Sequence, residues 1–326
     1  MKIREINLPS KIIIAPMAGV SNHAFRKVYR KYTKGLICAE MVSDKAILYR
    51  NEKTLNMINV DKDEGMVSMQ VFGGEVDNIV NAAKFIDENS NATFIDINMG
   101  CPVKKVLKTG GGSNLLKYPD KVKEIVTKVV NNVSKPVTVK IRAGFDFDSI
   151  NYLEIGQIIQ DSGASAITIH GRTRSQFYEG KANWDYIKDL KEHLDIPVIG
   201  NGDIQSVDDA IKMLEYTKCD AIMIGRGILG NPWLAKEIEY YLETGNRLEA
   251  PSYQEKINQA IEHLDLLVQE YGNKIGVTSM RSHGAWYLKG LSENARVRQA
   301  LNTENTYEGM KKIFEDYIIF LDNKKQ

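Results

Sequence analysis

The segment Phe94-Ile-Asp-Ile-Asn-Met-Gly-Cys-Pro102 points most directly to the architecture of this chain. A short apolar run rich in β-branched residues stops at a glycine, and a cysteine and a proline follow at once. Such a run is typical of a buried parallel strand. In α/β enzymes the carboxyl ends of these strands carry the chemistry. The pattern therefore predicts that Cys101 is presented at the end of a strand and not inside a core.

Strand-like runs of this kind recur eight times, each followed by polar or glycine-rich residues and then by helical periodicity. They are Ile12–Ala15, Leu36–Ala39, Val67–Phe72, Phe94–Asn98, Val137–Ile141, Ala166–His170, Val198–Asn201 and Ala221–Ile224. Eight alternating units predict an α/β fold of the (β/α)8 TIM-barrel type. The alternative is a doubly wound open sheet. It rarely needs eight units, and the first turn here lacks its G-x-G-x-x-G sequence.

Helical patterns lie between the strand runs and continue beyond them. Tyr118–Val130 repeats apolar residues at steps of three and four, and Ser206 is a good N-cap for the helix that follows it. A polar linker ends at Pro251, and beyond it we expect only helices, including 257–268 and 310–321. The predicted domains are therefore a barrel over residues 1–245 and a small all-helical domain over 252–326.

Composition excludes several classes of protein. The 326 residues carry a formal net charge of +1, so no global polyanion-binding field exists. Three widely spaced cysteines, Cys38, Cys101 and Cys219, argue against a disulfide scaffold and a zinc site, and the scattered histidines show no metal spacing. No apolar run approaches the roughly 20 residues of a membrane span. We expect a soluble cytoplasmic protein with no metal and no obligate protein partner.

Polar residues gather at the carboxyl ends of the predicted strands. The most specific are Asn201-Gly-Asp203 and Gly225-Arg226, two glycine-bearing turns that lead toward helices. Main-chain amides exposed by such turns form an anion pocket, and barrels often bind a phosphate there. The alternative is that these glycines only permit tight turns.

Three other side chains at strand ends favour a ligand site. Lys140 lies in an otherwise largely apolar strand, where a lysine needs an anion, a cofactor or a carboxylate such as Glu40 or Asp96. Gln70 can form paired amide hydrogen bonds to a heteroaromatic ring. His170 ends a strand and is followed by two arginines, which favours contact with an anion or ligand over a structural histidine.

Cys101 has three interpretations: an inert buried thiol, a nucleophilic thiolate or a neutral acid. An ordinary thiol has a pKa of about 8.5 and is mostly protonated near neutral pH. No histidine belongs to the immediate motif, so proton donation is at least as plausible as nucleophilic attack.

Taken together, these strings resemble the tRNA-dihydrouridine synthases, and most closely their bacterial B-type branch. The resemblance runs in order over nearly the whole chain. It rests on Ala15-Pro-Met-Ala-Gly-Val20, Asn98-Met-Gly-Cys-Pro102, Lys140-Ile-Arg142, His170-Gly-Arg-Thr-Arg174, Ile199-Gly-Asn-Gly-Asp-Ile204, Gly225-Arg-Gly-Ile-Leu-Gly-Asn-Pro-Trp233 and Trp286-Tyr-Leu-Lys-Gly290. The combination of Asn-Met-Gly-Cys-Pro with His-Gly-Arg-Thr-Arg is highly specific, whereas any one string alone is not.

The resemblance implies an FMN-binding barrel followed by a helical RNA-binding domain, which reduces particular uridines of tRNA to 5,6-dihydrouridine with NADPH or, alternatively, NADH. By position, the residues expected at the FMN are Pro16, Met17, Ala18, Gln70, Lys140, His170, Asn201, Gly202, Asp203, Gly225 and Arg226. Cys101 is the implied catalytic proton donor. Asn98, Arg142, Arg172 and Arg174 are expected to contact the substrate.

Such chemistry suits a neutral thiol. The C5=C6 bond of uracil is conjugated to a carbonyl, so it accepts a hydride at C6 and then needs a proton at C5. A positioned acid of this kind typically contributes about 10²–10⁴ in rate. The base must also leave its stack, which costs a few kcal/mol that phosphate contacts must offset.

Candidate phosphate contacts are basic residues on the first predicted helix, near the strand ends and in the helical domain. They are Arg26, Lys27, Arg30, Lys31, Arg174, Arg281, Lys289, Arg296 and Arg298. For each, the alternative is a solvated helix face. Residues 252–326 contain ten Lys or Arg and ten Asp or Glu, so any RNA surface there must be a local patch.

Two loops could close over a bound base, Lys108–Ser113 and Arg142–Asp148, unless they are ordinary connections. Four other functions stay open. They are reduction or oxidation of a free pyrimidine, reduction of ribosomal RNA uridines, RNA binding by an inactive barrel, and cofactor-free isomerisation of a sugar phosphate.

Overall fold

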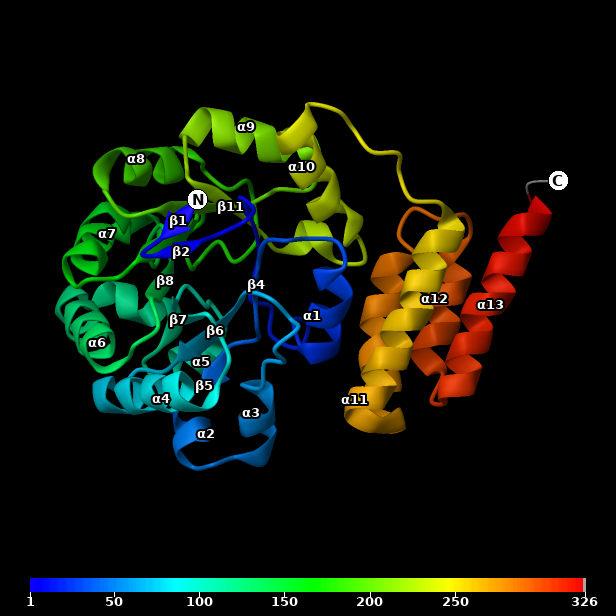
Figure 1. Cartoon of the computed structure of the whole chain (residues 1–326), viewed down its shortest axis with the longest axis horizontal. Coiled ribbons are helices and arrows are strands. Elements are labelled where there is room, and N and C mark those ends of the chain that lie inside the picture. The colour runs from blue at the N-terminus through cyan, green and yellow to red at the C-terminus, as the bar shows by residue number, and fades with distance from the viewer. Residues whose placement is uncertain (325–326) are drawn as a thin grey trace. The chain divides into compact units, whose positions relative to one another are not determined.

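A computed structural model describes residues 1–324 (Figure 1). Within them, the chain divides into two compact units. One comprises Met1–Asn22 and Thr33–Arg226, and the other comprises His23–Tyr32 and the chain from Gly227 onward. The second unit thus gathers α1 (His23–Arg30) and α10 (Trp233–Thr244) with the C-terminal helices. The domain limits 1–245 and 252–326, which rest on composition, stay a prediction.

Eight parallel strands form a closed barrel, which confirms the expected fold. They are β3 (Ile12–Ile14), β4 (Leu36–Cys38), β6 (Val67–Phe72), β7 (Phe94–Met99), β8 (Val137–Arg142), β9 (Ala166–His170), β10 (Val198–Asn201) and β11 (Ala221–Ile224). Each strand pairs with the next, β11 pairs with β3, and β4 pairs with β6, so no edge is left open. The short β5 (Val42–Ser43) extends the pairing of β6.

The strands coincide with the runs of apolar, β-branched residues in the sequence. Every predicted strand bound agrees with the structure within one residue. All six residues of β7 are buried, as expected for a strand covered on both faces. A small hairpin of β1 (Lys2–Ile3) and β2 (Ile6–Asn7) was not predicted. Ile3 and Leu8 cluster with the strand-starting residues Phe94 and Ala166, so the hairpin closes the amino-terminal end of the barrel. The hairpin does not cover the carboxyl-terminal end of the barrel, where the predicted site residues lie.

Helices surround the strands in Figure 1. The long ones are α4 (Val76–Asn89), α6 (Pro119–Asn132), α7 (Tyr152–Asp161), α8 (Asp185–His193) and α9 (Val207–Thr217). Short helical turns are α2 (Asp44–Leu48), α3 (Glu52–Met57), α5 (Lys104–Leu107), η1 (Gly112–Lys117), η2 (Phe147–Ser149) and η3 (Arg226–Ile228). The predicted helix near 118–130 is α6, which has a proline at its start. Ser206 caps α9 as expected and accepts a hydrogen bond from the Asp209 N–H at 3.1 Å.

Over its described residues, the second unit contains helices and connections but no strand. Besides α1 and α10 it contains α11 (Tyr253–Tyr287), α12 (Asn294–Thr303) and α13 (Tyr307–Lys324), and the two predicted C-terminal helices lie within α11 and α13. Ser252 and Glu255 form a capping box at the start of α11, and Gly272 interrupts that helix at φ +75°. Leu264, Met280 and Phe314 are fully buried in the shared core of these helices.

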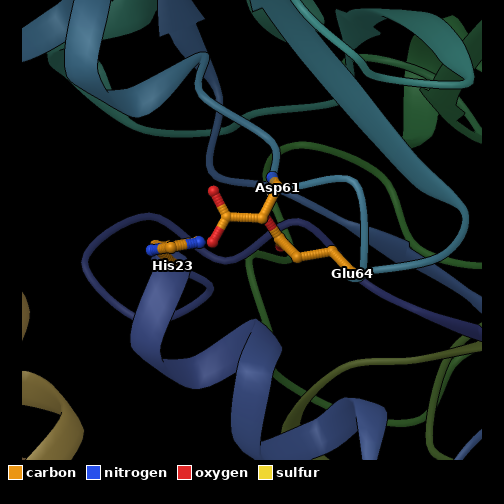
Figure 2. A group of neighbouring side chains, drawn as sticks. All are labelled: His23, Asp61 and Glu64. Atoms are coloured by element: carbon orange, nitrogen blue, oxygen red, sulfur yellow. Dashed lines mark hydrogen bonds between the residues drawn. The ribbon is translucent and has the colours of Figure 1, made fainter.

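The connection between α3 and β6 is closed by its own polar groups (Figure 2). The Asp61 N–H donates to Glu64 Oε1 at 2.8 Å, and the Glu64 N–H donates to the Asp61 carbonyl at 3.1 Å. Figure 2 also labels His23, the first residue of α1. Among the described helices of both units, none combines the length and apolar character that crossing a membrane requires.

Candidate functional site

Strand register brings the predicted site residues together at one end of the barrel. Asn98 pairs with Lys140 across β7 and β8, and Arg142 pairs with His170 across β8 and β9. His170 in turn pairs with Asn201 on β10. Because parallel strands end at the same edge of a sheet, these polar side chains share the carboxyl-terminal mouth with Cys101, which lies two residues beyond the end of β7.

Cys101 is partly exposed, whereas Cys38 and Cys219 are buried. Its main-chain N–H donates to Asn98 Oδ1 at 2.9 Å, and its carbonyl accepts from Ser113 Oγ at 2.9 Å. Burial raises the pKa of the Cys101 thiol, and this outweighs the opposing effects of the Val103 N–H, Arg142 and Lys140. The group is therefore a neutral thiol near neutral pH, which is the form that can donate a proton.

A chain of buried side chains leads to the Cys101 turn. Asp96 accepts hydrogen bonds from Gln70 Nε2 at 2.6 Å and from Thr138 Oγ1 at 2.5 Å. Gln70 Oε1 accepts from Asn98 Nδ2 at 2.6 Å. The amide of Gln70 is thus engaged at both ends, and its remaining N–H and lone pair are what it can offer to a ligand.

Lys140 has no carboxylate partner among the described residues. Its Nζ donates to Asn201 Oδ1 at 3.0 Å, and Asn201 Nδ2 donates to the Met223 carbonyl at 2.8 Å. Burial lowers the pKa of Lys140 to about 8, with a smaller effect of Arg142 in the same direction and an opposing effect of Asp96. A partly buried lysine held by a neutral amide suits a ligand that is electron-rich or anionic.

Asp203 joins two arginines at the end of β10. Its carboxylate accepts from Arg172 Nη2 at 2.7 Å, from the Ala182 N–H at 2.7 Å and from Arg226 Nη2 at 3.2 Å. These contacts outweigh the opposing effect of burial and lower the pKa of Asp203. A carboxylate repels a phosphate, so Asp203 would serve an anion site by orienting Arg226, whose side chain is 47% exposed.

The two glycine turns differ in what they require. Gly202 has φ +137°, and a Cβ there would lie 2.6 Å from Ala182 Cβ and 3.3 Å from His170 Cδ2. Gly225 would meet only Ala15 Cβ, at an ordinary 3.7 Å. Packing alone therefore demands glycine at 202, whereas at 225 it leaves room that a ligand close to the main chain could use.

His170 is buried and neutral. Its pKa lies well below the ordinary value, first because of burial and then because of Arg142, Lys140 and the arginines of the Asp203 cluster. Arg172 Nη1 lies 3.3 Å from His170 Nε2. A guanidinium can only donate, so Nε2 is the acceptor and the proton of the neutral ring is on Nδ1.

The predicted substrate-contacting arginines differ in their freedom. Arg172 is 1% exposed and bonds to Asp203 and to two carbonyls. Arg142 is also buried and donates to the carbonyls of Gly100, Thr173 and Phe177. Arg174 stacks over Phe145 at 4.9 Å, and its Nε has no partner among the described residues. Substrate contact by these residues stays a prediction.

Tyr178 is a residue that the sequence analysis missed. Its exposed ring lies below the guanidinium of Arg226 at 4.6 Å and near that of Arg142 at 5.8 Å. With Arg172, Trp184, Asp203 and other residues, it lines an open pocket of about 800 Å³. A tyrosine in a polar loop carries no periodic signal, so only its position after His170-Gly-Arg-Thr-Arg could have indicated it.

The first strand end presents its main chain. The Met17 carbonyl accepts from the N–H groups of Val20 and Ser21, and the Gly19 N–H donates to Glu40. Pro16, Met17 and Ala18 remain partly or fully exposed in this turn. They are thus accessible to a ligand at the barrel mouth, as the predicted cofactor contact requires.

The glycine-rich loop after Cys101 packs closely onto the loop after β6. A Cβ at Gly74 would lie 2.1 Å from the Thr109 carbonyl oxygen, and one at Gly111 would lie 2.4 Å from the Gly73 carbonyl oxygen. A Cβ at Gly112 would meet the Cys101 carbonyl oxygen at 2.8 Å. In this structure these glycines serve close main-chain packing that supports the Cys101 turn.

The candidate phosphate contacts fall into two groups. On α1, Lys27 pairs with Glu270 at 3.1 Å and Arg26 is 2% exposed, and directly after α1 Lys31 pairs with Glu262. Arg281 donates to the Glu304 carbonyl at 2.8 Å. By contrast, three residues are exposed and form no ion pair within the described chain; they are Lys289, Arg296 and Arg298.

Comparison with known proteins agrees with this site. The family model described as dihydrouridine synthase matches residues 13–323. The chain is 45% identical to tRNA-dihydrouridine synthase B of Pasteurella multocida over 302 residues, which is 93% of this chain and 91% of that protein. It is 40% identical to tRNA-dihydrouridine synthase B of Vibrio cholerae over 317 residues, 97% of this chain and 98% of that protein.

A solved structure of morphinone reductase in complex with tetrahydroNAD shares the fold, with a TM-score of 0.51 and 12% identity over 78% of this chain and 92% of that one. Barrel, strand-end thiol and matching family together define the class: the chain belongs to the dihydrouridine synthase family, whose members are flavin-dependent oxidoreductases. Within that family it falls in the bacterial B-type branch.

The residues present fit a flavin. Lys140 offers a partly buried cation that no carboxylate of the described residues pairs with, Gly225 leaves space above the main chain, and Arg226 offers a half-exposed guanidinium. These are the donors that an electron-rich ring and a terminal phosphate require.

Proposed function

We propose that this protein is a tRNA-dihydrouridine synthase that reduces uridines of tRNA to 5,6-dihydrouridine, with FMN as its cofactor and NADPH as the source of electrons. The observation that carries the proposal is the Cys101 thiol. Burial keeps this thiol neutral, and a turn that Asn98 anchors holds it at the barrel mouth, after the strand next to that of Lys140.

The cofactor contacts follow from the donors at the strand ends. Lys140 would neutralise charge near the ring, and one free N–H of Gln70 would face its polar edge. The turns Asn201–Asp203 and Gly225–Arg226 would hold the phosphate, with Asp203 keeping Arg226 in place. Pro16, Met17 and Ala18 would pack against the ring, and His170 would stay neutral beside it.

When bound, the reduced flavin supplies a hydride for C6 of the uracil ring. The C5=C6 π bond breaks as the C6–H bond forms, and its electrons leave an enolate that is protonated at C5. Cys101 gives that proton, so its S–H bond breaks as the C5–H bond forms. The thiolate left behind is stabilised by Arg142 and Lys140 and regains a proton from solvent.

Substrate contacts are proposed for Asn98, Arg142, Arg172 and Arg174, with different roles. Asn98 Oδ1 and the side chains of Arg142 and Arg172 are largely engaged within the protein, so they shape the cavity that receives the base. Arg174 lies on Phe145 and is less buried than Arg142 and Arg172, so it is the arginine best placed to reach RNA. We propose that the reaction takes place in the cytoplasm, where tRNA is found, and that the helical unit adds RNA contacts.

The test is a comparison of the wild type with Cys101→Ala, given tRNA transcript and NADPH, with dihydrouridine measured by mass spectrometry. We expect Cys101→Ala to keep its bound FMN and its reduction by NADPH, and to lose dihydrouridine formation by about 10²–10⁴. Full activity of the variant would remove the thiol from the mechanism. Equal reduction of free uracil would assign a free-pyrimidine reductase instead, and a purified wild type that binds no flavin would exclude both.

A further inference from the structure

Four lysines follow Cys101 without an intervening acidic residue. They are Lys104, Lys105, Lys108 and Lys117, and the next acidic residue along the chain is Asp120. The first two lie in α5, Lys108 is its C-cap, and Lys117 ends η1. All four side chains are exposed. The loop beside the proposed acid therefore carries concentrated positive charge in a chain whose net charge is only +1.

None of these four lysines is neutralised by the protein in the described residues. Neither an ion pair nor a side-chain hydrogen bond is formed by Lys104, Lys105 or Lys108, and Lys117 stacks over Phe145 at 3.5 Å. Two other lysines differ in this respect, since Lys27 of α1 and Lys31, directly after α1, are paired with glutamates of α11. Like charges at positions i and i+4, such as Lys104 and Lys108, destabilise a helix. The repulsion between these lysines therefore lowers the stability of the folded protein, and no ion pair within the described residues offsets it.

The lysines do not serve to ionise the thiol. Burial raises the pKa of Cys101, and the cations that oppose this effect are Arg142 and Lys140, not those of α5. The positive charges of these lysines are thus available to bind an anionic ligand.

The segment is tied to the acid and so presents its charges at a defined place. The Val103 N–H is hydrogen-bonded to the Cys101 thiol, and the buried Val106 anchors α5. Ser113, after the segment, donates from both N–H and Oγ to the Cys101 carbonyl. Lys104, Lys105 and Lys108 are thus exposed within seven positions of Cys101, on a segment that is bonded to it on both sides.

We propose that α5 and its cap form a phosphate clamp: Lys104, Lys105 and Lys108 bind the RNA backbone next to the uridine under reduction. The clamp rests on the proposed function, and its three lysines are distinct from the candidate phosphate contacts that the sequence indicates. Lysine contacts to phosphates are strong and independent of base identity, so the clamp would hold the strand and leave the choice of base to the cavity. A flipped base requires such contacts to offset the lost stacking.

The test compares Lys104→Gln/Lys105→Gln/Lys108→Gln with a control that removes the same charge from outer helices, Lys84→Gln/Lys123→Gln/Lys212→Gln. Both are measured with tRNA transcript for affinity over a series of salt concentrations, for KM and for kcat. We expect the clamp variant to raise KM roughly tenfold or more and to reduce the slope of log K against log salt by about 2–3, with the control unchanged. A third variant with arginine at the three clamp positions keeps the charge and should retain affinity.

Flavin content and reduction by NADPH without RNA should be equal in all variants. The clamp is excluded if its glutamine variant shows the same KM and salt slope as the control. Failure of the proposed function looks different: the wild type would then form no dihydrouridine at all, while the salt slopes would still report whether these lysines bind RNA.

Discussion

Asn98 Oδ1 accepts a hydrogen bond from the main-chain N–H of Cys101 at 2.9 Å and a second from that of Gly100 at 3.2 Å. The amide can point this way because its Nδ2 is used by Gln70, whose own Nε2 donates to Asp96. Both carboxylate oxygens of Asp96 accept in this arrangement, from Gln70 Nε2 and Thr138 Oγ1, although burial raises the pKa of the group. Asp96 therefore determines which group donates and which accepts in each hydrogen bond of this series. The series ends at the turn that contains Cys101.

We expect Asp96→Asn to remove the constraint that orients the side-chain amides of Gln70 and Asn98. An asparagine can present either its oxygen or its NH₂ to Gln70, so the amides of Gln70 and Asn98 could flip. We expect kcat for dihydrouridine formation to fall by up to about 10²-fold, because small misplacements of a catalytic group have effects of this size. KM for tRNA should stay the same.

The control for this variant is Thr138→Val, which removes the other donor to Asp96 but leaves Gln70 and Asn98 in place. It should lower the free energy of unfolding by about 1–3 kcal/mol and keep kcat. Equal losses of kcat in both variants would show that Asp96 acts through stability alone.

Lys140 predicts a pH dependence of flavin binding. Its pKa is lowered to about 8, so the cation is present below that pH and is lost as the pH rises through it. FMN affinity of the wild type should therefore fall above about pH 8, as measured by fluorescence titration of apoprotein. Lys140→Met should bind FMN more weakly at neutral pH and show no such change. An identical alkaline fall in that variant would assign the effect to another group.

Gly202→Ala should disturb the anion site through strain. The residue has φ +137°, and a Cβ would press against Ala182 and His170. We expect the free energy of unfolding to drop by about 1–3 kcal/mol and FMN to be lost on gel filtration. Gly225→Ala is the matched comparison, because its Cβ has room. It should leave unfolding unchanged, so a loss of FMN affinity there would report contact between the ligand and the main chain.

The helical unit should be sensitive to acid because of a buried histidine pair. The rings of His263 and His283 lie 4.4 Å apart, and burial lowers the pKa of His283 to about 4 and that of His263 well below its ordinary value. The unfolded chain binds protons near pH 6.5, so stability is complete above that pH and declines as the pH falls toward 4. For His283 alone the loss approaches roughly 3 kcal/mol.

Urea unfolding between pH 7 and pH 4, followed by circular dichroism, measures this loss. His283→Phe should flatten the decline, whereas the exposed His193→Gln should not. If the free energy of unfolding of both variants falls with pH as it does in the wild type, carboxylates and not the histidine pair govern stability in acid.

Part of the candidate site could be predicted from the amino-acid sequence. The strands were predicted within one residue because buried parallel strands are continuous apolar runs, and every residue that follows such a run faces the same mouth. The β1–β2 hairpin was missed because two-residue strands have no periodicity. Tyr178 and Thr138 were missed because single polar residues gain meaning only from what they contact.

The amino-acid sequence by itself determined the eight-unit barrel, the position of Cys101 at a strand end and the family to which the chain belongs, since apolar periodicity and ordered motifs are local properties. Only the tertiary structure decided which charges are satisfied. It pairs Asp203 with Arg172 and Arg226, pairs Lys27 and Lys31 with glutamates of α11, and leaves Lys104, Lys105 and Lys108 without partners among residues 1–324. The physical reason is that an ion pair depends on which faces meet in space, and these partners lie up to 243 positions apart along the chain.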